Sequence, residues 1–189
     1  PARPTAHRGD AESKVHQTRG PPLTAATLNP KPARSSTPPP PAAIGGGTAG
    51  AGVAAALRDA GLPVTLVERD AEALARGLAN VSAIFDGAVK RGRLNEADAA
   101  IRMAGVTATT DYAALADTDL VIEAVFEEIS VKRAVFASLA TACRTDAILA
   151  TNTSYLDPRA IAEGLPNPGR FIGLHFFSPA NVMKLLEIV

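Results

Sequence analysis

The stretch "IGGGTAGAG", residues 44–52, places Gly45, Gly47 and Gly50 in the spacing G-x-G-x-x-G. It follows a short apolar run and precedes an alanine-rich segment that predicts a helix ending near Ala60. A strand–loop–helix setting of this kind is typical of dinucleotide-binding loops. We expect Gly45 to permit the tight turn, Gly47 to admit a pyrophosphate to the backbone, and Gly50 to let the helix pack closely. The alternative is a flexible Gly/Ala linker.

The loop and the second apolar run together predict a nucleotide site. The predicted cofactor-binding residues of the loop are Gly45, Gly46, Gly47, Thr48, Ala49 and Gly50. Glu68 directly follows "VTLV" (64–67), at the spacing where such sites place an acid that accepts hydrogen bonds from ribose hydroxyls. A carboxylate there repels a 2′-phosphate and favours NAD over NADP, although Arg69 beside it weakens that exclusion. Taken alone, Glu68 could also be a surface acid before a helix.

Apolar runs alternate with helical patterns from residue 42 onward. Predicted strands lie at 42–44, 64–67, 106–110, 120–125, 147–152 and 170–177. Asn95, Ser130 and Asp157 are the expected N-caps of three of the intervening helices. Strand–helix alternation predicts an α/β fold, a Rossmann-type, doubly wound and mainly parallel sheet with helices on both faces. The first strand is unusual because "PPPPAAI" (38–44) brings prolines, which cannot donate to a sheet, up to its start.

The first 41 residues differ in composition from the rest of the chain. They hold ten of the 15 prolines and six Lys/Arg against two Asp/Glu, whereas residues 42–189 hold 13 against 17. We expect the proline-rich segment, with His7 and His16, to be a disordered tail or linker. The acidic remainder argues against nucleic-acid binding. No apolar stretch reaches the length of a membrane span.

The single cysteine narrows the chemistry further. Cys143 alone supports neither a disulfide framework nor a cysteine metal site, and we predict no metal site. A lone thiol fits a reducing compartment such as a bacterial-type cytoplasm.

The last twenty residues, "RFIGLHFFSPANVMKLLEIV" (170–189), contain the only histidine after residue 41. His175 lies at the end of a predicted strand, as do Glu68 and Asn152, and ligands collect beyond the carboxyl ends of parallel strands. Glu187 lies in an otherwise apolar run, where a carboxylate is costly unless it is paired. We therefore predict a His175–Glu187 pair acting as a general base. A core histidine with no catalytic role is the alternative.

Four motifs resemble a known family. They are the glycine loop, "DLVIEAVFEE" (119–128), "ATNTS" (150–154) and "GLHFFSPANVMKLLEIV" (173–189). In this order and spacing they resemble the NAD-binding domain of 3-hydroxyacyl-CoA dehydrogenases, and most of all the dehydrogenase part of multifunctional fatty-acid β-oxidation proteins. The resemblance covers residues 42–189. It implies NAD as cofactor and oxidation of a 3-hydroxyacyl-CoA to the 3-ketoacyl-CoA.

The resemblance also implies roles for individual residues. The catalytic residues would be His175, Glu187, Ser154 and Ser178, with Ser178 standing where many members carry asparagine. The further cofactor contacts would be Glu127, Lys132, Asn152 and again Ser154. A basic cluster, Lys90, Arg91 and Arg93, could meet coenzyme A phosphates or form a solvated helix end. Ala49 and Tyr155 depart from the family's usual methionine and serine.

Members of the family carry a helical C-terminal domain that completes the acyl site and mediates homodimerisation. Because nothing follows Val189, we expect a truncated piece that retains the NAD-binding logic and is active only with that second domain. A non-catalytic dinucleotide-binding module, or an inactive fragment of such an enzyme, is the alternative function.

Overall fold

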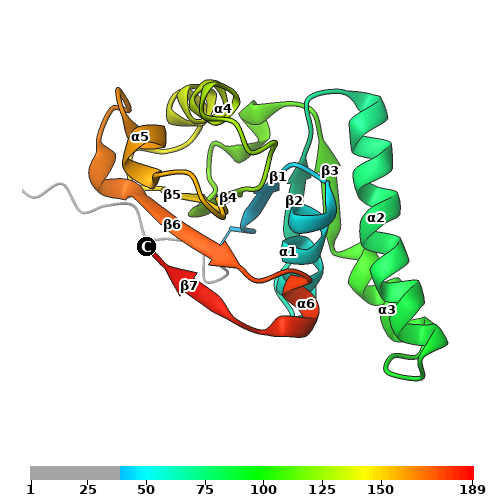
Figure 1. Ribbon diagram of the computed structural model, residues 1–189. Helices are drawn as coiled ribbons and strands as arrows, with labels where there is room; N and C mark the ends of the chain where they lie inside the picture. Colours follow the sequence, from blue (N-terminus) through cyan, green and yellow to red (C-terminus); the bar gives the residue numbers. More distant parts are fainter. Residues whose placement is uncertain (1–38) are drawn as a thin grey trace, which may run out of the picture. The chain divides into compact units, whose positions relative to one another are not determined.

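The computed structural model describes residues 39–189, so the predicted disordered tail, with His7 and His16, lies almost wholly outside the described residues. The described residues form a seven-stranded sheet in the order β3-β2-β1-β4-β5-β6-β7 (Figure 1). Its strands are β1 Ala42–Ile44, β2 Val64–Val67, β3 Val106–Thr109, β4 Leu120–Glu123, β5 Ile148–Thr151, β6 Phe171–Phe176 and β7 Leu186–Ile188. Strands β1 to β6 pair in parallel, and β7 runs antiparallel beside β6.

The strand order confirms the predicted Rossmann-type, mainly parallel sheet. The chain winds outward from β1 to β3 and then returns to add β4, β5 and β6 on the other side of β1. The crevice beyond the carboxyl ends of β1 and β4 is therefore the switch point at which ligands bind in such sheets.

Helices connect the strands on both faces of the sheet (Figure 1). They are α1 Thr48–Asp59, α2 Ala71–Lys90, α3 Glu96–Ala104, α4 Ile129–Ala142, α5 Pro158–Ala162 and α6 Ala180–Met183, with single 3₁₀ turns at Tyr112–Leu115 and Pro168–Arg170. Among residues 39–189, none of these helices is both long and apolar enough to cross a bilayer.

The two faces of the sheet have separate cores because successive strand residues point to opposite sides. Ala42 and Ile44 of β1 pack with Phe136 and Leu139 of α4, whereas Ala43 packs with Ala54 of α1. All three β1 residues are essentially inaccessible to solvent. The small side chain of Ala43 lets α1 approach the sheet closely, with its N-terminus at the switch point.

The proline run before β1 is compatible with a central strand. Pro41 lies just outside the strand and contributes only its carbonyl, which accepts a hydrogen bond from Thr65 N at 3.0 Å. The first N–H that the sheet requires therefore comes from a residue after the prolines. At the other end, Ile44 O accepts from Ala124 N at 2.8 Å, so β1 is paired on both sides.

Two of the three predicted N-caps are confirmed and one is wrong. Asn95 accepts from Asp98 N at 2.7 Å, and Asp157 accepts from Arg159 N at 2.9 Å. Helix α4 instead begins at Ile129 after Glu128, so Ser130 lies inside its first turn, where its hydroxyl bonds the Glu128 carboxylate. The sequence also gave no indication of α6 or of the antiparallel strand β7.

Candidate functional site

The glycine loop has the geometry of a phosphate cradle. Gly45 has φ +94°, and a Cβ there would lie 2.8 Å from Ala124 O. A Cβ on Gly50 would lie 1.7 Å from Gly45 O, so only glycine lets the first turn of α1 fold back against the loop. A Cβ on Gly47 would meet no atom within 4 Å. Gly47 is therefore the position where the backbone is open to a ligand, at the N-terminus of α1.

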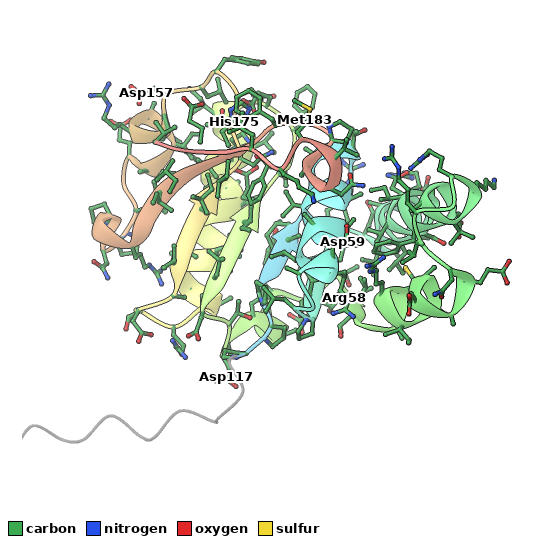
Figure 2. The ribbon with its side chains drawn as sticks, turned by 90° about the horizontal axis from the view of Figure 1, so that it is seen from below. Arg58, Asp59, Asp117, Asp157, His175 and Met183 are labelled. Atoms are coloured by element: carbon green, nitrogen blue, oxygen red, sulfur yellow. The ribbon has the colours of Figure 1, made fainter. Side chains whose placement is uncertain are left out.

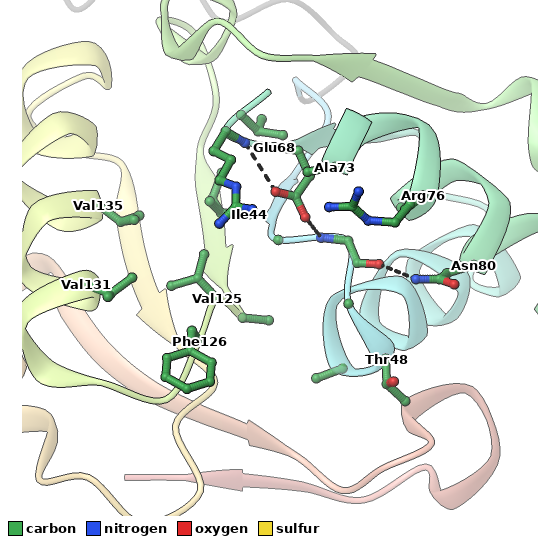
Figure 3. Close-up of a pocket in the computed structure, with 18 of the residues that line it drawn as sticks. Ile44, Thr48, Glu68, Ala73, Arg76, Asn80, Val125, Phe126, Val131 and Val135 are labelled. Atoms are coloured by element: carbon green, nitrogen blue, oxygen red, sulfur yellow. Dashed lines mark hydrogen bonds between the residues drawn. The ribbon is translucent and has the colours of Figure 1, made fainter. Parts of the chain in front are cut away.

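Glu68 and α2 hold the loop from behind (Figure 3). Glu68 Oε1 accepts from Gly46 N at 2.6 Å, and Asn80 Nδ2 donates to Gly46 O at 2.8 Å. Gly77 of α2 faces Gly46 backbone to backbone, since a Cβ on Gly46 would lie 2.5 Å from the Gly77 Cα. The Glu68 carboxylate, which is expected to accept hydrogen bonds from the ribose hydroxyls, is thus held beside the glycine loop.

A cavity of about 690 Å³ joins these residues to the far side of the switch point. Its wall runs from Glu68 and Arg76, across Thr48, to Val125 and Phe126 after β4 (Figure 3). Arg69 and Arg76 beside Glu68 are ion-paired with Asp70 and Glu72, at 3.0 and 2.5 Å. Each guanidinium near the ribose end therefore has a carboxylate partner of its own.

Tyr112, the first residue of the 3₁₀ turn, also lines this cavity. Burial raises the pKa of its phenol, and the negative charges of Glu68 and Glu123 raise it further. Tyr112 therefore contributes a neutral phenol to the wall of the cavity near Glu68.

A buried ion pair lies under the β4–α4 loop. Lys132 Nζ is 2.6 Å from Glu123 Oε1 and 3.1 Å from Glu127 Oε2, and both Lys132 and Glu123 are fully buried. Glu123 accepts two further hydrogen bonds, from Val125 N at 2.7 Å and from the Thr151 hydroxyl at 2.7 Å. Lys132, expected from the resemblance to contact the cofactor, points inward instead, and its ammonium reaches the site only through Glu127.

Glu127 ties the β4–α4 loop to the loop after β5. Its Oε1 accepts from the Thr153 hydroxyl and from Ser154 N, the latter at 2.8 Å. Partial burial alone would raise the pKa of the Glu127 carboxyl, but the bonds from Thr153 and Ser154 and the nearby Lys132 ammonium lower it below its usual value. Glu127 is thus held as a carboxylate at the edge of the crevice.

His175 and Glu187 are brought together by pairing between β6 and β7, where they are directly opposite each other. His175 Nδ1 lies 3.3 Å from Glu187 Oε2. The burial expected for Glu187 is wrong, because its side chain is 60% exposed while that of His175 is 19% exposed. In Figure 2, His175 lies at the opposite end of the molecule from Asp117, which precedes β4, as expected for a residue at the carboxyl ends of the strands.

The remaining predicted residues lie at the same edge of the sheet but contact one another less. Asn152 is buried, and its Oδ1 accepts from Phe176 N at 2.8 Å, so it fixes the end of β6. Ser154 and Ser178 follow β5 and β6 with exposed side chains. Thr48 and Ala49 line the cavity. The basic cluster 90–93 is the exception, because it is exposed at the C-terminal end of α2, a helix that begins at this edge and runs away from it for 20 residues.

Comparison with known proteins places this geometry in a family. Residues 42–189 match the family model described as the 3-hydroxyacyl-CoA dehydrogenase, NAD binding domain. The chain belongs to this family. Its membership confirms the resemblance of the four motifs and confirms NAD as the predicted cofactor.

Individual relatives give the extent of the match. The chain is 45% identical over 142 residues to the 3-hydroxyadipyl-CoA dehydrogenase of Escherichia coli, covering 75% of this chain and 30% of that protein. It is 41% identical over 140 residues to a peroxisomal fatty acid beta-oxidation multifunctional protein of rice, covering 74% and 19%. A crystal structure of 3-hydroxybutyryl-CoA dehydrogenase from E. coli superposes with a TM-score of 0.74 at 43% identity, covering 80% of this chain and 32% of that one. The chain thus spans less than a third of the length of these curated relatives.

Sequence reasoning missed several residues of this NAD-binding domain. Glu123 and Thr151 lie within runs that indicate buried strands, and nothing local marks them as members of a charged cluster. Gly77 and Asn80 lie within a helical pattern, and only their approach to Gly46 gives them a role. The one available signal was Glu123 itself, because a carboxylate in an apolar strand requires a buried partner.

Proposed function

We propose that residues 42–189 are the NAD-binding and catalytic-base domain of an NAD-dependent 3-hydroxyacyl-CoA dehydrogenase. The observation that carries the proposal is the common edge of the sheet, where the glycine cradle, Glu68, Glu127 and the His175–Glu187 pair all lie beyond strand ends. A nucleotide cradle and a paired histidine at one edge are what hydride transfer coupled to proton transfer requires.

The residues present fit NAD. Gly47 leaves the cradle open where a side chain would fill it, and Glu68 is fixed within reach of a ribose. When bound, NAD supplies the acceptor for the hydride from C3 of the substrate. Around it, the α1 N-terminus would hold the diphosphate, and Glu127, Asn152 and Ser154 would line the half beyond β4. Lys132 would act on the cofactor through Glu127.

The histidine pair supplies the base. With Nδ1 donating to Glu187, His175 keeps Nε2 free to take the proton of the 3-hydroxyl group. The Glu187 carboxylate then stabilises the imidazolium that forms. Ser154 and Ser178 have exposed hydroxyls on the loops that follow β5 and β6, and we assign them to the substrate oxygen. The loss of hydride and proton turns the 3-hydroxyacyl-CoA into the 3-ketoacyl-CoA.

A second function is favoured by one observation. Glu187 is 60% exposed and both serines are solvent-accessible, so this edge is open in the chain as it stands. An open catalytic edge beside a complete cofactor cradle also suits a non-catalytic NAD-binding module.

For the dehydrogenase, we propose that turnover and homodimerisation both require a helical second domain, and that the enzyme acts in the cytoplasm or another reducing compartment of fatty-acid oxidation.

A domain exchange tests the proposal. Residues 42–189 replace the matching segment of the E. coli 3-hydroxyadipyl-CoA dehydrogenase, and NADH formation is followed on 3-hydroxybutyryl-CoA, with the 189-residue chain assayed in parallel. We expect turnover by the chimera, and a loss of about 10²–10⁴ in His175→Gln with NAD affinity nearly unchanged.

The control variant is Asp117→Asn, at the opposite edge of the sheet, which should leave both turnover and NAD affinity unaltered (Figure 2). A folded chimera that binds NAD but forms no NADH supports the non-catalytic module instead. Unchanged turnover per folded molecule in His175→Gln would remove the catalytic assignment.

A further inference from the structure

The buried charges under the β4–α4 loop do not cancel. The cluster formed by Glu123, Lys132 and Glu127 holds two carboxylates around one ammonium, within 2.6 and 3.1 Å. No other charged side chain is ion-paired with these three among residues 39–189. The Glu123–Lys132–Glu127 cluster therefore carries a formal net charge of −1.

The cluster is fixed in place rather than able to rearrange. Glu123 is fully buried, and its two oxygens are occupied by Lys132, Val125 N and the Thr151 hydroxyl. The Lys132 ammonium has no route to solvent, because its side chain is fully buried. The Glu127 side chain is 24% exposed, so its carboxylate is the part of the cluster that presents the excess negative charge to the crevice.

The position of the cluster identifies the part of the cofactor that it faces. In the proposed site, Glu68 would hold the ribose of the adenosine half on the β2 side, and the α1 N-terminus would hold the diphosphate at the centre. The cavity then continues to Val125 and Phe126, the residues directly before Glu127. The half that carries the nicotinamide would then lie on this side, between Glu127 and the strand that holds His175.

We propose that the Glu123–Lys132–Glu127 cluster shifts the relative affinity of the site toward oxidised NAD and away from reduced NAD, and that Glu123 is the residue that leaves the cluster negative. The inference rests on the proposed function of the site. The oxidised nicotinamide ring carries a formal positive charge and the reduced ring carries none, while the rest of the cofactor is unchanged. A fixed negative charge therefore distinguishes the two forms by Coulombic attraction alone.

The consequence of this preference is directional. The charge favours binding of the oxidised cofactor and release of the reduced cofactor. Repeated oxidation of hydroxyl groups requires this exchange after every turnover. Because the preference also stabilises the oxidised form on the protein, a tenfold preference lowers the potential of the bound couple by about 30 mV.

Binding measurements on the full chain test the charge directly. Dissociation constants of NAD⁺ and NADH are measured by calorimetry for the wild type and for Glu123→Gln, which brings the cluster to zero charge. We expect the ratio of the NAD⁺ constant to the NADH constant to rise by about fivefold to thirtyfold, the range for one unit charge acting across partly buried protein. Glu96→Gln on α3 is the matched control, and its ratio should equal that of the wild type.

A rescue variant separates charge from structure. The double variant Glu123→Gln with Lys132→Gln removes the buried pair but leaves Glu127 alone, so the net charge returns to −1. We expect its ratio to return toward the wild-type value. A purely structural role for the pair predicts instead that both forms of the cofactor weaken equally in the single and the double variant.

The remaining outcomes are also decisive. If Glu123→Gln does not fold, Glu127→Gln applies the same charge change at a partly exposed position and must raise the ratio. An unchanged ratio in a folded, charge-neutral variant overturns the inference while leaving the proposed function intact. A wild-type chain that binds neither NAD⁺ nor NADH overturns the proposed function, and this inference with it.

Discussion

Gly47→Ala should separate cofactor binding from stability. In the free chain the new methyl group meets no atom within 4 Å, and the backbone at φ −64° and ψ −174° is one that alanine adopts without strain. Two small effects on stability then oppose each other. Alanine is a poorer N-cap than glycine, which costs about 0.5–1 kcal/mol, and it restricts the unfolded chain, which contributes about 0.4–1 kcal/mol.

The same methyl group should be costly once a diphosphate binds. Backbone N–H groups of the cradle reach phosphate oxygens at about 2.9 Å, and a methyl beside them keeps such an oxygen farther away. Loss of one hydrogen bond to a charged group costs about 1.5–3 kcal/mol, or roughly tenfold to 150-fold in the dissociation constant. We therefore expect Gly47→Ala to unfold within about 0.5 kcal/mol of the wild type and to bind NAD at least tenfold more weakly.

Gly50→Ala is the matched change three residues along the same motif. Its Cβ would lie 1.7 Å from Gly45 O and 2.9 Å from Gly45 C, so backbone must move. We expect a loss of at least about 2 kcal/mol in unfolding free energy, despite the better helix propensity of alanine. Urea denaturation followed by circular dichroism measures stability, and calorimetry measures NAD binding. Wild-type NAD affinity in Gly47→Ala, or wild-type stability in Gly50→Ala, would refute the assignment of the two glycines.

Three further predictions follow from single contacts. Glu68 should make NAD bind more tightly than NADP by at least tenfold, about 1.4 kcal/mol, and equal affinities in a titration of both cofactors would reject its role. The pKa of Glu127 is lowered in the folded chain, so its ionised form stabilises the fold above the ordinary value of 4.5 and this contribution is lost as pH falls through the lowered pKa. The difference in unfolding free energy between wild type and Glu127→Gln should therefore shrink below pH 4.5, and a difference independent of pH would contradict it. Asp157→Ala should lower the melting temperature as a lost N-cap and Ser130→Ala should lower it clearly less, whereas equal losses in thermal melts would argue against the observed start of α4.

The parts of the fold that the sequence predicted are those set by local patterns. The glycine spacing and the buried-type runs such as "VTLV" identified six parallel strands, because hydrophobic runs between helices have few other solutions. Strand β7 was missed because the chain reverses after β6 to pair with it in antiparallel orientation, and the local pattern of apolar residues does not indicate such a reversal. The cap at Ser130 was misplaced by two residues because Glu128 begins α4 without a side-chain cap bond.

In the site as well, features set by neighbouring residues could be predicted, and features set by contacts between distant residues could not. The His175–Glu187 pair was predicted for a reason that proved wrong, since the apolar neighbours of Glu187 in β7 are themselves exposed. An apolar stretch indicates burial only where another element covers it. Glu123 was missed because its partner Lys132 lies on the next helix, and a buried pair of opposite charges leaves no regular pattern in a sequence.

The approach of Gly46 to Gly77 ties the phosphate cradle to α2. Backbone meets backbone there, with Asn80 bonded to Gly46 O one turn farther along the helix. The height of the cradle above the sheet is therefore set by a segment that belongs to no recognised nucleotide motif. If the sequence of the glycine loop were transferred to another scaffold without α2, the motif would be present but its backbone conformation would lack this support. In diverging descendants of this domain, a larger residue at position 77 should be tolerated only where the loop has changed with it.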